Sequence, residues 1–209
     1  MNRTILTIGR QFGSGGREIG KNLADAMGIS FYDKELITLA AQESGLCREV
    51  FEKTDERASQ GLSHLFSVSM PYPGVAYTPY SDILSNEGLF KIQSDVIRKL
   101  ADAESCVIVG RCADYILRDH PGCVSFFIHD TQCNRIRRIA ERLQLSLEQA
   151  KELIAKTDKS RAAYYGYYTD KTWGMSCSYN FSINASVLGI DETVCFMKNF
   201  IDRKSISGL

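Results

Sequence analysis

The chain has 209 residues, of which 44% are hydrophobic and 24% charged, values typical of a globular protein with a full core. Basic and acidic residues number 25 each, so no net charge draws the chain to nucleic acid or to a membrane. The start, MNRTILTIGR, lacks the long apolar stretch of a signal peptide, and no apolar run approaches the roughly 20 residues of a transmembrane helix. The seven cysteines show no C-x-x-C spacing, so we expect reduced thiols in a cytoplasmic protein without a metal site.

The first half of the chain alternates strands and helices. Short β-branched and aromatic runs predict buried strands, and apolar residues every three or four positions predict helices. In chain order we expect a strand at 4–8, a helix at 17–28, a strand at 29–32 and helices at 33–45 and 46–58. Residues 59–81 hold three of the four prolines and have no sustained period, which predicts a long loop.

The second half continues this alternation. In chain order we expect a helix at 89–103, a strand at 106–110, a short helix at 111–118, a strand at 123–129, helices at 131–143 and 146–165, a strand at 181–186 and a helix at 191–203. Ser146 and Gln149 have the spacing of a capping box. Strands that alternate with helices predict a parallel sheet covered on both faces, whose ligands bind beyond the carboxyl ends of the strands. Gly9, Gly110 and Asp130 lie at such ends.

A glycine-rich stretch, IGRQFGSGGREIGK, joins the first predicted strand to the first predicted helix. Backbone N–H groups of such a turn can surround a phosphate, and the helix dipole adds positive charge. The spacing G-x-x-x-x-G-K-[ST] is not met, because Gly16 and Arg17 follow Gly15 where Lys and Ser or Thr would stand. A plain glycine-rich turn is therefore the alternative interpretation. Arg17 is the first candidate for the missing positive charge, and Arg10 and Lys21 compete with it.

Three arginines share one face of the helix predicted at 131–143. Arg135, Arg138 and Arg142 are spaced at i, i+3 and i+7. One interpretation is a solvated face paired with Glu141 or Glu148; the other is an arginine-bearing lid over a triphosphate.

Other polar and aromatic residues extend the predicted site. Arg111 directly follows a buried strand, at the edge where the glycine loop lies. Asp158 and Arg161 are one helical turn apart, which fits an intrahelical ion pair or a ligand contact. The segment 164–173 holds four tyrosines and the only tryptophan. Its alternatives are packing on the protein's own core, a contact between subunits, and a mobile arm that closes over a ligand.

Taken in this order, the glycine loop, YDKELI, GR, RIRRIAERL, DKSR and INAS resemble the cytidylate kinase-like branch of the P-loop nucleoside monophosphate kinases, over roughly 4–58 and 100–203. The resemblance implies an α/β P-loop NTPase-type fold of three layers with a parallel sheet. It divides one domain into a core (1–45, 100–130 and 178–209), an inserted acceptor-binding lobe (46–99) and a helical lid (131–175). It also implies phosphoryl transfer from ATP, with Mg²⁺, to a nucleotide such as CMP or dCMP.

The resemblance further implies residue roles. The donor phosphates would be bound by the loop and the first helix, at Gly9, Arg10, Gly13, Ser14, Gly15, Gly16, Arg17, Glu18 and Lys21. The acceptor would be bound by Asp33, Arg111, Asp158 and Arg161. Catalysis would involve Arg17, Asp33, Arg135 and Arg138, and no protein group is expected to form a metal site of its own.

The chain departs from that family's pattern at several positions. Cys112 replaces the aspartate of the GRD motif, and Asn184 stands for an aspartate in the last motif. Ile154 and Ala155 occupy the places of an arginine-aspartate pair, and 59–86 matches no motif. The alternatives are therefore a non-catalytic nucleotide- or anion-binding regulator on the same fold, or a kinase of another small acceptor.

Overall fold

The computed structural model describes residues 3–34 and 86–207. The predicted helices at 33–45 and 46–58 and the loop at 59–81 fall almost wholly outside these residues. The contacts divide the chain into two compact units, 1–34 with 101–209 and 35–100. The site described below belongs to the first unit.

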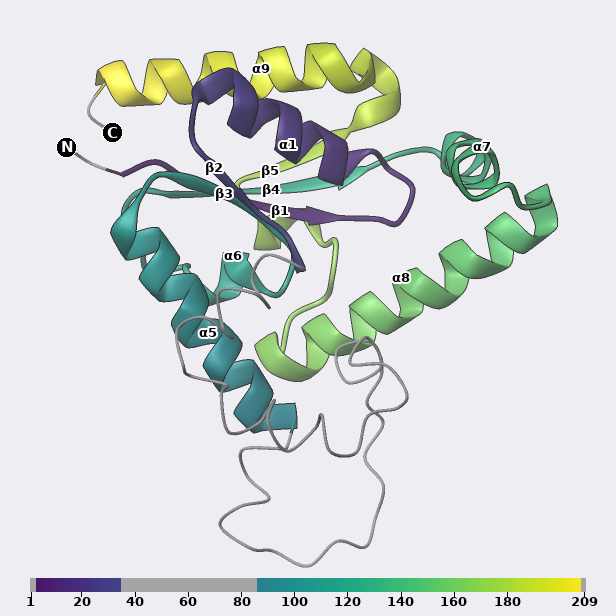
Figure 1. The fold of residues 1–209 in the computed structure, drawn as a ribbon, viewed down its shortest axis with the longest axis horizontal. Coiled ribbons are helices and arrows are strands. Elements are labelled where there is room, and N and C mark those ends of the chain that lie inside the picture. Colours follow the sequence, from purple (N-terminus) through teal and green to yellow (C-terminus); the bar gives the residue numbers. More distant parts are fainter. Residues whose placement is uncertain (1–2, 35–85, 208–209) are drawn as a thin grey trace, which may run out of the picture. The chain divides into compact units, whose positions relative to one another are not determined.

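Five parallel strands form the sheet of this unit (Figure 1). They are β1 (Ile5–Arg10), β2 (Ser30–Tyr32), β3 (Cys106–Val109), β4 (Cys123–His129) and β5 (Phe181–Asn184). Their order is β2-β3-β1-β4-β5, and Ile8 lies beside Val109 while Arg10 lies beside Ile128. The predicted parallel sheet is confirmed, and the carboxyl ends of all five strands lie along one edge.

The helices of the described residues are α1 (Gly16–Met27), α5 (Asn86–Ala103), α6 (Ala113–Ile116), α7 (Gln132–Leu143), α8 (Leu147–Thr169) and α9 (Ala185–Ser207). In Figure 1, α1 and α9 cover one face of the sheet, and α6 lies on the other. The core under α1 and α9 includes Ile8, Leu23, Phe126, Ile128 and Met197, each 1% exposed or less. Burying such a side chain contributes about 1.5–3 kcal/mol, so this layer fixes β1 and α1, which carry the glycine loop.

Two helix boundaries differ from the prediction. The helix from Leu147 continues past Gly166 to Thr169, whereas the sequence predicts an end near Tyr165; its capping box at Ser146 and Gln149 is confirmed. Helical structure already begins at Ala185, and a kink at Gly189 separates this short first segment from the helix predicted at 191–203. Its early start follows from Asn184, whose Oδ1 accepts hydrogen bonds from the Ser186 N–H at 3.1 Å and the Ser186 hydroxyl at 2.7 Å.

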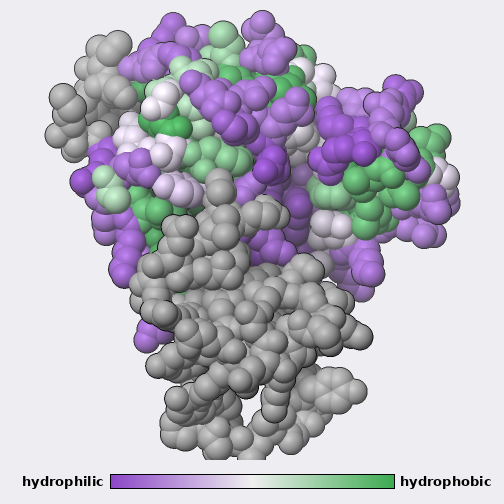
Figure 2. Space-filling view, in the orientation of Figure 1, coloured by the Kyte–Doolittle hydropathy of each residue, from purple (hydrophilic) through white to green (hydrophobic). Residues whose placement is uncertain are grey.

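The surface of the described residues is mostly hydrophilic in the view of Figure 2. Apolar surface appears there on the arm formed by α7 and α8, and Leu143 and Leu147 at the turn between these helices are exposed. None of the helices in the described part of the chain combines the length and the apolar content that crossing a bilayer requires.

Candidate functional site

The turn between β1 and α1 holds two glycines in the left-handed region, Gly13 with φ 81° and Gly15 with φ 83°. Between them the Ser14 side chain turns inward and is fully buried. Its hydroxyl donates to the Gln11 carbonyl at 2.9 Å and accepts from the Gly16 N–H at 3.3 Å. Ser14 therefore holds the turn together from inside.

Four backbone N–H groups, in the turn and in the first turn of α1, are available to bind an anion. Within 3–34 and 86–207, no hydrogen-bond acceptor meets the N–H groups of Gly13, Gly15, Arg17 or Glu18. The helical pattern begins with the Ile19 N–H, which donates to the Gly15 carbonyl at 2.9 Å. Converging N–H groups and the positive end of a helix dipole are the usual features of a phosphate site.

Helices α7 and α8 hold the loop backbone at Phe12 through one ion pair. The buried Arg135 donates from Nε to the Phe12 carbonyl at 2.8 Å and forms an ion pair with Asp158. Asp158 accepts in turn from the Phe12 N–H at 2.8 Å. One of the two sequence interpretations pairs the arginine face of this helix with Glu141 or Glu148. The partner of Arg135 is instead Asp158, because α8 packs along α7 and brings Asp158 beside it.

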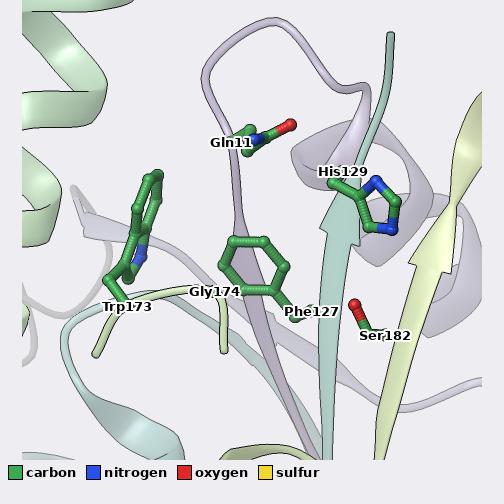
Figure 3. Close-up of a pocket in the computed structure, with 6 residues that line it drawn as sticks. All are labelled: Gln11, Phe127, His129, Trp173, Gly174 and Ser182. Carbon is green, nitrogen blue, oxygen red and sulfur yellow. The ribbon is translucent and has the colours of Figure 1, made fainter. Parts of the chain in front are cut away.

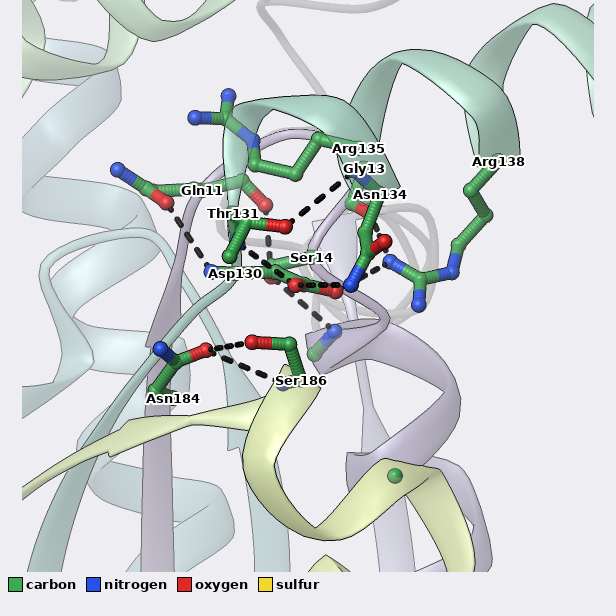
Figure 4. Close-up of polar contacts among 12 residues, drawn as sticks. Gln11, Gly13, Ser14, Asp130, Thr131, Asn134, Arg135, Arg138, Asn184 and Ser186 are labelled. Atoms are coloured by element: carbon green, nitrogen blue, oxygen red, sulfur yellow. Dashed lines mark hydrogen bonds and ion pairs between the residues drawn. The ribbon is translucent and has the colours of Figure 1, made fainter.

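A second arginine of α7 reaches the next residue of the loop. Arg138 donates to the Gly13 carbonyl and, at 2.9 Å, to Oδ2 of Asp130 (Figure 4). The Asp130 carboxylate is fully buried and also accepts from the Asn134 side chain at 3.1 Å and the Thr131 N–H at 2.6 Å. Asp130 thus joins the end of β4 to the first turn of α7 and orients Arg138.

Two further arginines lie over the Phe12 ring. The guanidinium carbons of Arg142 and Arg161 are 5.6 and 5.4 Å from its centroid, within the range of a cation–π contact. Arg161 also donates to the Arg10 carbonyl at 2.9 Å. Burial lowers the pKa of the Arg161 guanidinium; Asp158 opposes this shift, while Arg135, Arg111 and Arg142 lower the pKa further. Four arginines of α7 and α8 thus contact this loop, two of them paired with Asp130 and Asp158.

The remaining predicted residues of α1 are turned to other partners. Arg17 donates from Nε to the buried carboxylate of Asp33 at 2.8 Å, although its own side chain is 63% exposed. Lys21 pairs with Asp25 one turn further along the helix. Glu18 is exposed in the first turn.

The turn after β3 is strained. Gly110, Arg111 and Cys112 all have positive φ, at 82°, 56° and 54°. Such strain in residues other than glycine often marks a functional position. The Arg111 guanidinium lies 5.8 Å from the centroid of the Tyr164 ring on α8. Burial raises the pKa of the Cys112 thiol to about 12.

A partly buried aspartate lies just beyond this turn. Asp114 accepts a hydrogen bond from the Tyr165 hydroxyl at 2.7 Å, which ties the end of α8 to α6. Burial raises the pKa of Asp114, and the hydrogen bond from Tyr165 opposes part of that shift. Nothing in the sequence besides the nearby GR motif marks Asp114.

A pocket of about 270 Å³ lies beside the loop, where β4 and β5 meet the segment after α8 (Figure 3). It is lined by Gln11, Phe127, His129, Trp173, Gly174 and Ser182. The indole of Trp173 meets the Phe127 ring edge-on at 5.4 Å. None of these residues is among the predicted site residues, although Gln11 lies in the glycine-rich stretch and Trp173 in the tyrosine-rich segment 164–173.

The structure therefore gathers most of the predicted residues at one edge of the sheet. The loop, Arg135, Arg138, Asp158 and Arg161 are connected by hydrogen bonds and ion pairs. Sequence reasoning missed Phe12, Gln11 and Asn134. A large aromatic residue inside a glycine-rich turn is the one signal that could have indicated Phe12.

Strand order β2-β3-β1-β4-β5, with a glycine loop between β1 and α1, defines a P-loop NTPase-type kinase fold. The shikimate kinase of Bacteroides thetaiotaomicron shares this fold, with a TM-score of 0.54 and 14% identity over 95% of this chain and 98% of that one.

Within that class, the chain belongs to the cytidylate kinase-like family, which it matches over residues 5–187. It is also similar to an uncharacterized protein from Eubacterium ventriosum ATCC 27560, with 30% identity, a TM-score of 0.70 and coverage of 96% of this chain and 99% of that one. Among curated proteins no match was found.

Proposed function

We propose that this chain is an ATP-dependent phosphotransferase of the nucleoside monophosphate kinase type, with CMP or dCMP as its acceptor. The observation that carries the proposal is the set of N–H groups at Gly13, Gly15, Arg17 and Glu18, which have no acceptor among the described residues. Arginines on α7 and α8 contact the same loop at Phe12 and Gly13. Membership of the cytidylate kinase-like family supports the same reaction class.

The donor triphosphate would lie on the loop, and the acceptor phosphate would be bound by Arg111 and Arg161. Phosphoryl transfer depends mainly on positioning and charge neutralisation, so N–H groups and guanidinium groups can supply much of what it needs. Arg138 would stabilise developing charge from its place beside Gly13. Arg135 would act first through the loop backbone, because its guanidinium is paired with Asp158.

A magnesium ion would enter with the triphosphate. Across 3–34 and 86–207, no group of three His, Cys, Asp or Glu side chains could hold a metal ion. Kinase sites commonly bind Mg²⁺ through one or two carboxylates together with substrate phosphates and water. Asp33 and Asp130, whose carboxylates face Arg17 and Arg138, would be the acidic groups that contribute to this binding. The ion would neutralise phosphate charge during transfer.

The test is a phosphoryl-transfer assay on the purified full chain with ATP and Mg²⁺. CMP, dCMP, UMP, AMP and GMP are offered separately, and both ADP and the diphosphate product are quantified. We expect turnover to be highest with CMP or dCMP. ATP binding without transfer to any acceptor would favour a non-catalytic regulator, and transfer to other acceptors alone would refute the cytidine assignment.

A further inference from the structure

The glycine loop differs from G-x-x-x-x-G-K-[ST] at positions 10, 16 and 17, and the differences at positions 10 and 16 compensate for one another. Counted back from Gly15, the pattern places a glycine at position 10 and a lysine at position 16. This chain has Arg10 and Gly16 instead. The long basic side chain and the glycine have therefore exchanged places.

The structure shows that the two positions touch. A Cβ atom on Gly16 would lie 2.7 Å from Cβ and 3.2 Å from Cγ of Arg10, and 3.1 Å from Cβ of Ile128. Atoms at 2.7 Å overlap, and neither Cβ belongs to a flexible side-chain end that could move away. Positions 10 and 16 therefore cannot both carry a side chain in this loop conformation, and a side chain at position 16 would also require Ile128 to shift by a few tenths of an ångström.

The Arg10 guanidinium extends from β1 toward the neighbouring strand. A Cβ atom on Gly110 would collide with Nη1 of Arg10 and lie 3.0 Å from its Cζ. The guanidinium thus lies against the glycine that follows β3 and precedes Arg111. That place is beside the turn that carries the proposed acceptor-phosphate arginine.

The two competing basic residues point elsewhere. Arg17 is paired with the buried Asp33, and Lys21 is paired with Asp25 on the exposed side of α1. Arg10 is the one of the three whose side chain starts at the position in contact with Gly16.

We propose that Arg10 supplies, from the strand side of the loop, the positive charge that contacts the donor phosphates in place of the loop lysine. The inference rests on the proposed function and names the residue that binds its donor. A guanidinium presents a planar fork that can engage two phosphate oxygens, whereas an ammonium is a single point charge. Arg10 would therefore bind the triphosphate without a lysine at position 16.

The test measures nucleotide binding by calorimetry, independently of turnover. ATP, ADP and AMP are titrated into the parent chain, Arg10→Gln, Arg10→Gly and the double variant Arg10→Gly/Gly16→Lys, after circular dichroism shows that each is folded. Arg137→Ala is the matched control, since Arg137 is exposed on α7 and lies outside the site. Loss of one charged phosphate contact should weaken ATP binding by about 10- to 100-fold in Arg10→Gln.

The loss of affinity in Arg10→Gln should be largest for ATP and smallest for AMP. The control Arg137→Ala should bind ATP as the parent does. The double variant, which restores the glycine at position 10 and the lysine at position 16, should recover affinity relative to Arg10→Gly. If Arg10→Gln binds ATP as tightly as the parent, or if the double variant binds ATP no more tightly than Arg10→Gly, then Arg10 does not replace the loop lysine. The proposed function would stand in either case. A parent chain that binds no ATP would refute the proposed function itself.

Discussion

The backbone of Phe12 and Gly13 is held from outside the loop by three charged side chains. Asp158 accepts from the Phe12 N–H, Arg135 donates to the Phe12 carbonyl, and Arg138 donates to the Gly13 carbonyl. A glycine-rich turn has many accessible conformations, and ordering it on binding would cost affinity. These contacts set the N–H groups in place before an anion arrives.

Gly13 should be sensitive to even the smallest side chain. In Gly13→Ala the new Cβ would lie 2.9 Å from Cγ1 of Ile139 and 3.0 Å from the Arg135 carbonyl oxygen, at a φ of +81°. Gly28→Ala is the control, because φ is +65° there but nothing lies within 4 Å. Left-handed strain costs about 1–3 kcal/mol at either site. The additional loss of unfolding free energy in Gly13→Ala, relative to Gly28→Ala, therefore measures the steric clash. Urea unfolding should show Gly13→Ala as the less stable variant; equal losses would contradict this packing.

Asp114 should make stability depend on pH. Burial raises its pKa in the folded state above the unfolded value of about 3.9. The folded state then keeps the proton longer, so its stability falls as pH rises from the unfolded pKa through the folded one. Asp114→Asn keeps an acceptor for the Tyr165 hydroxyl and should remove that fall. The measurement is unfolding free energy against pH.

The control for Asp114 is Asp119→Asn, whose side chain is 87% exposed. The unfolding free energy of Asp119→Asn should depend on pH in the same way as that of the parent. If Asp114→Asn keeps the parent's decline with rising pH, the decline comes from other groups.

At the scale of elements, periodicity predicts the helices well, because it is a local property. The arginine face of α7 and the capping box of α8 are visible in the sequence alone. The pair between Arg135 and Asp158 spans 23 residues and forms only because α8 packs along α7. A pattern of spacing cannot show which carboxylate faces an arginine across two helices. Glu141 and Glu148 were therefore reasonable partners for the arginine face on the sequence alone, and Asp158 could not be singled out.

Breaking that pair should loosen α7, α8 and the loop together. Asp158→Asn leaves the Arg135 guanidinium, whose side chain is 8% exposed, without a carboxylate partner. Loss of one member of a buried pair costs about 3–5 kcal/mol. We expect a lower urea midpoint for Asp158→Asn, whereas Glu152→Gln on the exposed side of α8 should match the parent. Equal midpoints for the two variants would mean that the pair contributes nothing to stability.

At the scale of the whole chain, alternating strands and helices were enough to predict a parallel sheet, and the resemblance of the motifs was enough to predict the family. The exchange between Arg10 and Gly16 was not predictable, because it depends on how the loop folds back on the strand. The pocket beside Trp173 was not predictable either, since its lining comes from four separate segments. The cytoplasmic location and a subunit contact through 164–173 stay predictions.

Trp173 offers a test of whether the α7–α8 arm closes over nucleotide. Its indole lies against Phe127 of β4 and shares a pocket with Gln11 of the glycine loop (Figure 3). A ligand that reorders the loop or moves α8 should therefore change its fluorescence, because indole emission responds to its surroundings. We expect a change on adding ATP with CMP that is independent of protein concentration, as lid closure requires.

The control for this experiment is Tyr167→Ser, since the Tyr167 side chain is the most exposed of the tyrosines in 164–168, at 67%. Under lid closure, this substitution should leave the sedimentation coefficient unchanged. If the emission of Trp173 instead follows protein concentration, and Tyr167→Ser shifts the chain to a smaller species, then 164–173 is a contact between subunits. Closure over nucleotide would in that case be confined to residues 131–161, the part of the arm that carries Arg135, Arg138 and Arg161.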